Sequence, residues 1–131
     1  DASVKLGIPV VHGSIFRFEG MVTVFDPKNG PTYRDMVPQP PPAELAPSCA
    51  EAGVLGVLPG IVGSIQALET IKLLLGIGDS LVGRILSIDT TEMSFRTFKL
   101  RVDPDNEVTW ANRDRIEVRD VDGLCAPWLS H

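Results

Sequence analysis

Residues 38–47 carry five prolines in ten positions, and this stretch constrains the fold more than any other part of the chain. Proline fixes its own φ angle and has no amide hydrogen, so such a run favours extended polyproline geometry over a helix or a central strand. The folded elements must therefore lie before and after it. We expect residues 36–52 to form a surface strap within one domain.

Before the strap, the sequence predicts strands. Residues 8–14 are a short β-branched run, and residues 15–25 (IFRFEGMVTVF) alternate apolar and polar side chains. We expect two or three strands here, with a turn or bulge at Gly20. Residues 26–31 (DPKNGP) are typical of a turn, so the last of these strands should end at Phe25.

After the strap, apolar residues recur at helical spacing, at Ile61, Ile65, Leu68, Ile71 and Leu75. Pro59 suits the first turn of a helix and Gly76 suits its C-terminal end. Gln66, Glu69 and Lys72 interrupt the apolar stretch, which favours a buried helix over a membrane span. Small residues form a face that would let another backbone approach closely: Gly60, Gly63, Ser64 and Ala67.

A hairpin is expected after the helix. Residues 84–89 (RILSID) and 94–102 (SFRTFKLRV) read as alternating strands joined through TTEM. Beyond Pro104 the sequence is charged and irregular, with one more possible short strand at residues 116–118.

Composition narrows the class of protein. The chain has 131 residues and a net charge of -5, and its lysines and arginines are scattered, which disfavours nucleic acid and anionic lipid as partners. Two cysteines, Cys49 and Cys125, are too few for a disulfide framework. We therefore expect a reducing compartment, and the cytoplasm is the simplest interpretation because residues 1–11 lack the pattern of a signal peptide.

Few residues indicate chemistry by themselves. The glycine-rich run at residues 76–83 follows a helix and leads into a strand, the reverse of a phosphate-binding loop, so we interpret it as a turn. His12 has no serine or carboxylate at a recognisable spacing and reads as structural. Cys49 lies just ahead of the helix, where it could be a reachable nucleophile or a small packed side chain.

Three stretches together resemble a known family: GSIFRFEGMVTVFDPKNGPTYRD, CAEAGVLGVLPGIVGSIQALETIKLLLGIG and GRILSIDTTEMSFRTFKLRVDPD. They are similar, in this order, to the second half of the MoeB/ThiF-type adenylyltransferases, relatives of the ubiquitin-activating enzymes. The stretch PPPAELAPSCAEAGVLGVLPG is most similar to the MoeZ-type adenylyltransferase/sulfurtransferases, which carry a rhodanese domain after a linker.

The resemblance implies an α/β fold, α+β within this chain: the second half of a mixed-sheet, Rossmann-like domain. Residues 1–110 would belong to that domain, and residues 111–131 resemble the linker to a rhodanese-like domain. The proline strap would be the crossover loop over the tail of a carrier protein. Cys49 would be the catalytic thiol that bonds to the activated tail.

The implied function is ATP-dependent adenylation of the C-terminal Gly-Gly of a ubiquitin-like sulfur carrier (MoaD-like or ThiS-like). This activates the carrier for sulfur transfer into molybdopterin, thiamin or cysteine synthesis. ATP and Mg²⁺ would serve the complete enzyme, and further partners would be the N-terminal half of the same domain and a second copy in a homodimer. The alternative is a non-catalytic module that binds the carrier or dimerises.

Two departures limit this resemblance. Family members with a structural zinc bind it through two CxxC pairs, but the matching positions here are Thr32, Asp35, Asn106 and Thr109, so we expect no zinc. The nucleotide-binding motif would precede Asp1, and none is present within these 131 residues. We therefore expect no adenylation by this chain alone.

Overall fold

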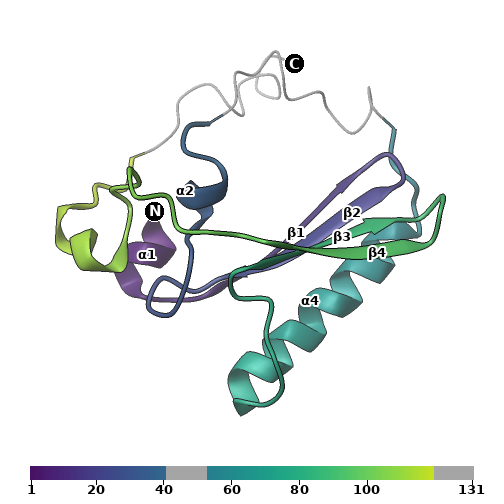
Figure 1. The fold of residues 1–131 in the computed structure, drawn as a ribbon, viewed down its shortest axis with the longest axis horizontal. Coiled ribbons are helices and arrows are strands. Elements are labelled where there is room, and N and C mark those ends of the chain that lie inside the picture. The colour runs from purple at the N-terminus through teal and green to yellow at the C-terminus, as the bar shows by residue number, and fades with distance from the viewer. Residues whose placement is uncertain (41–52, 120–131) are drawn as a thin grey trace, which may run out of the picture.

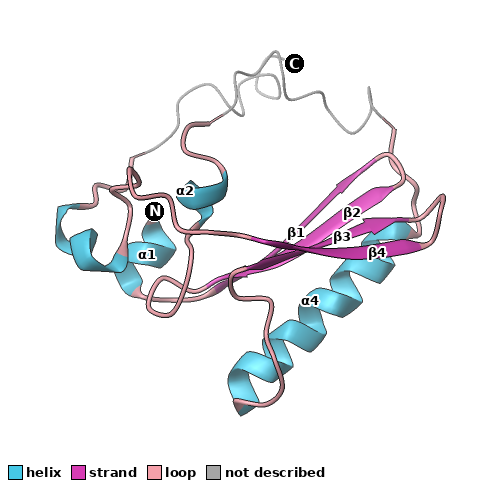
Figure 2. Ribbon diagram, viewed as in Figure 1, coloured by secondary structure: helices cyan, strands magenta, loops and turns pink. Residues whose placement is uncertain are grey.

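The computed structural model describes residues 1–40 and 53–119 (Figure 1). Its elements, in chain order, are α1 (Ala2–Leu6), β1 (Val10–Phe16), β2 (Glu19–Phe25), α2 (Tyr33–Met36), α4 (Leu58–Leu75), β3 (Arg84–Asp89), β4 (Ser94–Lys99) and the 3-10 helix η2 (Trp110–Arg115). Figure 2 shows one twisted sheet with α4 running across one of its faces and the short helices gathered at one end. The predicted mixture of strands and one long helix is confirmed.

The sheet has the order β1-β2-β3-β4, and every neighbouring pair is antiparallel. Val22 in β2 lies opposite Gly13 in β1 and Leu86 in β3, which fixes the register across the centre. Since side chains alternate between the two faces of a strand, this register decides which residues face α4 and which face away. The hairpin predicted at residues 84–102 is confirmed, although β4 ends at Lys99.

The turn or bulge predicted at Gly20 is wrong. Gly20 lies inside β2 opposite Ile15, and the chain reverses at Arg17 and Phe18, where Arg17 adopts a φ of 54°. The glycine serves close packing instead, because a Cβ atom at this position would lie 2.7 Å from Cγ2 of Val62 in α4. Any larger side chain would push the helix away from the sheet.

Helix α4 forms where the sequence predicts it. Pro59 sits in its first turn, and Gly76 ends it in the left-handed conformation with a φ of 63°. One side of the helix packs on the sheet and closes the apolar core. The buried members of that core are Val22, Val24, Leu58, Val62, Leu81 and Ile88.

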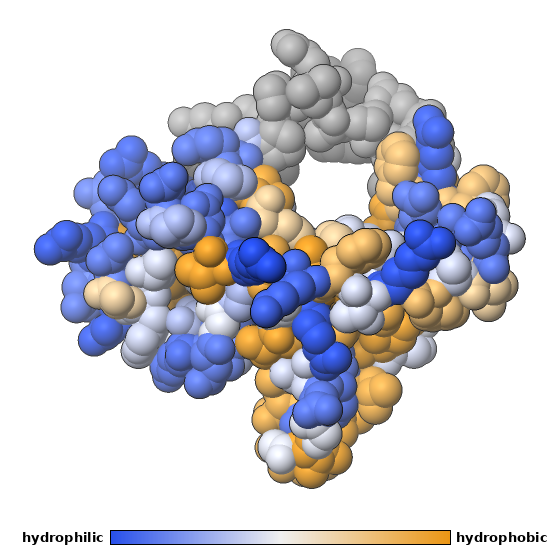
Figure 3. Space-filling model, in the orientation of Figure 1, coloured by the Kyte–Doolittle hydropathy of each residue, from blue (hydrophilic) through white to orange (hydrophobic). Residues whose placement is uncertain are grey.

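Only part of α4 is buried among the described residues, which corrects the expectation of a buried helix. Leu68, Leu74 and Leu75 are more than half exposed. A Cβ atom on Gly60 or Gly63 would meet nothing within 4 Å, so the predicted small-residue face has no partner within residues 1–40 and 53–119. Figure 3 shows apolar surface over the part of the molecule where α4 lies. Length and composition alone would also allow α4 to cross a membrane.

Polar residues of α4 fix the loop that leads into β3. Glu69 is 4% exposed, accepts a hydrogen bond of 2.7 Å from the Leu81 amide and pairs with Lys72. Lys72 in turn donates to the Asp79 carbonyl at 2.6 Å. The glycine-rich run at residues 76–83 is therefore a turn, as predicted, and these two side chains hold it in place.

A smaller cluster of α1 and η2 lies at the end of the sheet (Figure 1). The cations of Lys28 and Arg113 lie 4.9 and 4.4 Å from the ring centre of Trp110. The short strand predicted at residues 116–118 is absent from the described chain. Ile116 is instead buried, and its carbonyl accepts a hydrogen bond of 2.7 Å from Lys5 in α1.

Candidate functional site

The face of the sheet that points away from α4 carries a shallow groove, here called the open-face groove. Its volume is about 310 Å³, and its lining residues are Ser14, Phe16, Glu19, Gly20, Met21, Ile85, Ser87 and Phe98. The antiparallel register brings these residues together from all four strands. Helix α4 lies on the opposite face, and at one end of this face Tyr33 of α2 packs against His12 and Phe25.

The groove is unusually apolar for an exposed sheet face. Phe16 and Phe98 are 46% and 53% exposed, where an antiparallel sheet with one solvated face normally presents polar residues. Arg96 shares the face of Phe98 because it lies two residues away on β4. Exposed aromatic side chains beside charges are typical of surfaces that bind another protein.

The described chain after the strap returns to one end of this groove. The Arg17 guanidinium lies 5.1 Å from the centre of the Phe16 ring, and the Arg17 carbonyl accepts a hydrogen bond of 3.0 Å from Leu55. Arg17 also forms an isolated parallel bridge with Val54. The left-handed turn at Arg17 thus anchors the chain that emerges from residues 41–52 beside the groove.

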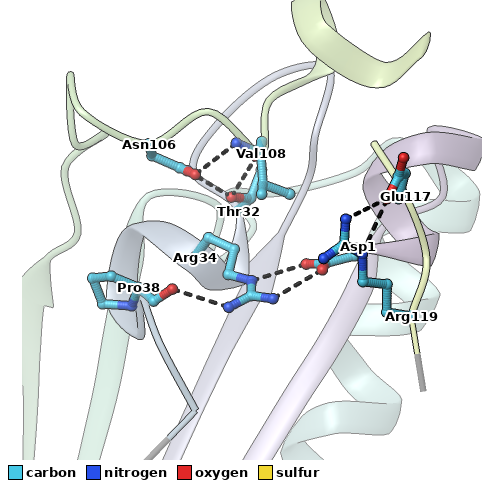
Figure 4. Close-up of polar contacts among 8 residues, drawn as sticks. All are labelled: Asp1, Thr32, Arg34, Pro38, Asn106, Val108, Glu117 and Arg119. Atoms are coloured by element: carbon cyan, nitrogen blue, oxygen red, sulfur yellow. Dashed lines mark hydrogen bonds and ion pairs between the residues drawn. The ribbon is translucent and has the colours of Figure 1, made fainter. Parts of the chain in front are cut away.

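The described chain before the strap is held by α2. Arg34 donates to both carboxylate oxygens of Asp1, at 2.9 and 2.8 Å, and to the carbonyl of Pro38 at 2.9 Å (Figure 4). A planar guanidinium suits such a two-pronged contact with a carboxylate. The start of the proline-rich segment is therefore fixed to the folded domain.

Three of the four positions that match zinc ligands in the family lie together. Thr32, Asp35 and Asn106 form one hydrogen-bonded group, while Thr109 precedes η2 and its side chain makes no hydrogen bond to that group. Zinc structural sites use thiolate and imidazole ligands. A hydroxyl, a carboxylate and an amide that already bind one another do not fit such a site. Within residues 1–40 and 53–119 there is also no group of three or more His, Cys, Asp or Glu side chains that could hold a metal.

Cys49, the predicted catalytic residue, lies outside the described residues, and so does Cys125. The structure therefore tests neither reading of the Cys49 thiol. It does place both described flanks of the strap, at Pro38 and at Val54, on the folded domain.

His12 has the structural environment expected for it. Its ring centre lies 5.6 Å from the rings of both Phe25 and Tyr33, and burial lowers the pKa of its imidazole. No described nucleophile or carboxylate contacts it by hydrogen bond or ion pair. His12 therefore belongs to an aromatic cluster between β1, β2 and α2.

The lowered pKa of His12 predicts a pH dependence of stability. The unfolded chain binds a proton near the ordinary pKa of about 6.5, whereas the folded chain resists protonation, so acid favours unfolding. The free energy of unfolding should fall as the pH drops through 6.5, and less so in His12→Gln. Urea unfolding of both proteins between pH 5 and 7.5 measures this, and an equal slope for the two would contradict it.

Sequence reasoning missed the open-face groove. Its signal was present, because in residues 15–25 both alternating sets contain large apolar residues: Ile15 and Val22 face α4, while Phe16 and Met21 face away. A strand that is apolar in both sets is typical of a sheet covered on both faces.

Comparison with known proteins places the chain in a family. The ThiF family profile matches residues 1–109. Curated relatives include the sulfur carrier protein adenylyltransferase of Thermus thermophilus, which is 45% identical over 130 residues covering 95% of this chain and 48% of the relative. The probable adenylyltransferase/sulfurtransferase MoeZ of Mycobacterium tuberculosis is 51% identical over 79% of this chain and 28% of its own length.

A third relative, the SAMP-activating enzyme E1 of Haloferax volcanii, is 48% identical over 92% of this chain and 44% of the relative. Among solved structures, E. coli MccB shares the fold with a TM-score of 0.63 at 10% identity, over 92% of this chain and 36% of MccB. The chain spans about half or less of the length of these proteins. The profile match and these identities establish that the chain belongs to the ThiF family.

Proposed function

We propose that this chain is the carrier-binding half of an ATP-dependent adenylyltransferase that activates the C-terminal Gly-Gly of a ubiquitin-like sulfur carrier. The relatives supply the reaction class, because one is named a sulfur carrier protein adenylyltransferase and another a probable adenylyltransferase/sulfurtransferase. The observation that carries the assignment of this half is the exposed apolar groove on the open sheet face. A small folded carrier would cover such a surface with its own apolar patch.

Adenylation would proceed by attack of the carrier's terminal carboxylate on the α-phosphorus of ATP, with pyrophosphate as leaving group. Adenylyltransferases of this family use ATP, and Mg²⁺ would balance the phosphate charge. The residues that bind the nucleotide are expected in the part of the relatives that this chain does not span. Residues of this chain would bind and orient the carrier so that its tail reaches that nucleotide.

Sulfur transfer would then use the activated tail. In the proposed step, the Cys49 thiolate attacks the acyl carbon, AMP leaves, and a thioester links the thiol to the carrier. The described flanks of the strap support this role, because Pro38 and Val54 are both fixed to the domain that carries the groove. Residues 111–131 would form the linker to a rhodanese-like domain.

The alternative is a non-catalytic module that binds the carrier or dimerises. The exposed apolar side of α4 favours a further protein contact, and we propose that the N-terminal half of the same domain or a second copy covers it. Carrier-stimulated exchange of pyrophosphate into ATP by this chain combined with its N-terminal half separates the two, since a binding module gives none even then. We also propose the cytoplasm as the location, because two cysteines suit a reducing compartment.

The thiol role predicts that Cys49 reacts faster than Cys125 with iodoacetamide in the native protein, because a nucleophile must be reachable. In the complete enzyme, Cys49→Ala should lower sulfur transfer while leaving carrier-dependent pyrophosphate exchange within about twofold, since adenylation does not need the thiol. Timed alkylation with peptide mass mapping measures the first result. Faster labelling of Cys125, with Cys49 protected, would assign Cys49 to packing, and Cys125→Ala is the matched control.

A further inference from the structure

We infer that Thr32, Asp35 and Asn106 form a metal-independent clamp that joins residues 31–38 to residues 103–109, in the place where other family members use zinc. This polar clamp goes beyond the proposed function, because it concerns how the domain is held together. The clamp also gives a structural role to three positions that match zinc ligands in other family members but carry no zinc ligand here.

Asp35 is the centre of the polar clamp. Its Oδ2 atom accepts a hydrogen bond of 2.6 Å from the Thr32 amide, and its Oδ1 atom accepts bonds from the Asp103 amide at 2.9 Å and from Asn106 Nδ2 at 2.8 Å. This one carboxylate thus binds a partner in its own turn and two partners that lie 68 and 71 residues away in the sequence. Hydrogen bonds to an ionised acceptor are among the stronger ones in proteins.

Thr32 and Asn106 complete the connection. Thr32 is 3% exposed, and its Oγ1 atom accepts a hydrogen bond of 3.1 Å from Asn106 Nδ2 (Figure 4). The same hydroxyl lies 3.2 Å from the Val108 carbonyl, to which it can donate. Asn106 Oδ1 accepts a bond of 2.9 Å from the Val108 amide. Every polar side-chain atom of this group therefore has a hydrogen-bond partner within the protein.

The polar clamp has a consequence for the strap. Asp35 holds α2 against residues 103–108, and Arg34 of the same short helix binds the Pro38 carbonyl. A helix of four residues is too short to be stable alone, so these side chains fix its position. The chain up to Pro38 is thus fixed to the domain by hydrogen bonds, without a metal.

Alanine substitutions test the polar clamp. Asp35→Ala should lower the melting temperature by about 5 °C or more, because two backbone amides and one side-chain amide lose their acceptor. Asn106→Ala should lower it by about 3 °C, and the double variant should lose less than the sum of the two. The matched control is Asp105→Ala, since the Asp105 side chain makes no hydrogen bond to the described residues; its melting temperature should stay within about 1 °C of wild type.

Two further measurements distinguish a clamp between distant segments of the chain from a local helix cap or a metal site. Hydrogen exchange of the Asp103 amide should be at least about tenfold faster in Asp35→Ala, while amides at the centre of β2 keep their wild-type rates. Treatment of the wild-type protein with EDTA should leave its melting temperature unchanged. Additive effects of the two alanine variants with an unchanged Asp103 amide would overturn the clamp, and so would a loss of stability on chelation.

Discussion

Replacing Glu69 with alanine is expected to lower the free energy of unfolding by about 3–5 kcal/mol, the largest effect on stability that we predict. The carboxylate is almost fully buried, accepts a hydrogen bond of 2.7 Å from the Leu81 amide and forms an ion pair with Lys72. Its removal leaves a buried amide without an acceptor and a cation without its partner. Urea unfolding followed by circular dichroism measures the loss.

Two matched variants sharpen this result. Glu69→Gln keeps an oxygen that can accept from Leu81 but removes the charge, so it should lose about half as much stability as the alanine variant. Glu92→Ala, in the exposed turn between β3 and β4, should change the free energy of unfolding by less than about 0.5 kcal/mol. A Glu69→Ala variant that loses less than about 1 kcal/mol would show that the loop at residues 76–83 does not depend on this carboxylate.

The second large effect is expected in the open-face groove. In the complete enzyme, Phe98→Glu should raise the carrier concentration needed for half-maximal pyrophosphate exchange by at least about tenfold, because it places a charge in the apolar centre of the proposed docking surface. The KM for ATP should stay unchanged, since the groove does not contact the nucleotide in this proposal. Stability should change little, because half of the Phe98 side chain is already exposed.

Phe95→Glu is a closely matched control. Phe95 lies on the same strand and is 52% exposed, against 53% for Phe98, but it points to the opposite face of the sheet. The same charge is therefore introduced at nearly the same exposure on the face opposite the open-face groove. Equal effects of the two substitutions would contradict carrier docking on the open face.

Local signals in the sequence predicted the backbone well. Gly76 ends α4 in the left-handed conformation, and residues 90–93 reverse the chain between β3 and β4 around the Asp89 carboxylate, which binds the Thr91 and Glu92 amides. Such stops and turns depend on nearby residues and on backbone geometry. They can therefore be read from one stretch of sequence.

Contacts between distant segments could not be predicted in the same way. Local sequence suggests a turn at Gly20, but the glycine is needed there because Val62 packs against it. Local sequence suggests a strand at Ile116, but its carbonyl accepts a hydrogen bond from Lys5 instead. The polar clamp joins Asp35 to Asn106, and only the fold shows that these residues meet. Tertiary packing decides such positions, and it overrides local propensity.

The candidate site was predictable only where family motifs carried it. The motif with Gln66, Glu69 and Lys72 pointed to the ThiF family, but the structure assigns these residues to packing: Gln66 donates to the Val11 carbonyl, and Glu69 and Lys72 hold a loop. The open-face groove had no motif. Its residues come from four strands and gather only when the register is known.

Photo-crosslinking from the open-face groove tests whether the carrier docks there. Benzoylphenylalanine placed at Phe98 should crosslink to a purified MoaD-type or ThiS-type carrier that ends in Gly-Gly, whereas the same group at Phe95 should not, because only Phe98 faces the groove. We expect a covalent adduct of one carrier per chain, with its site mapped to residue 98 by mass spectrometry. Crosslinking from Phe95 and not from Phe98, or from neither in a preparation active in carrier-dependent exchange, would contradict it.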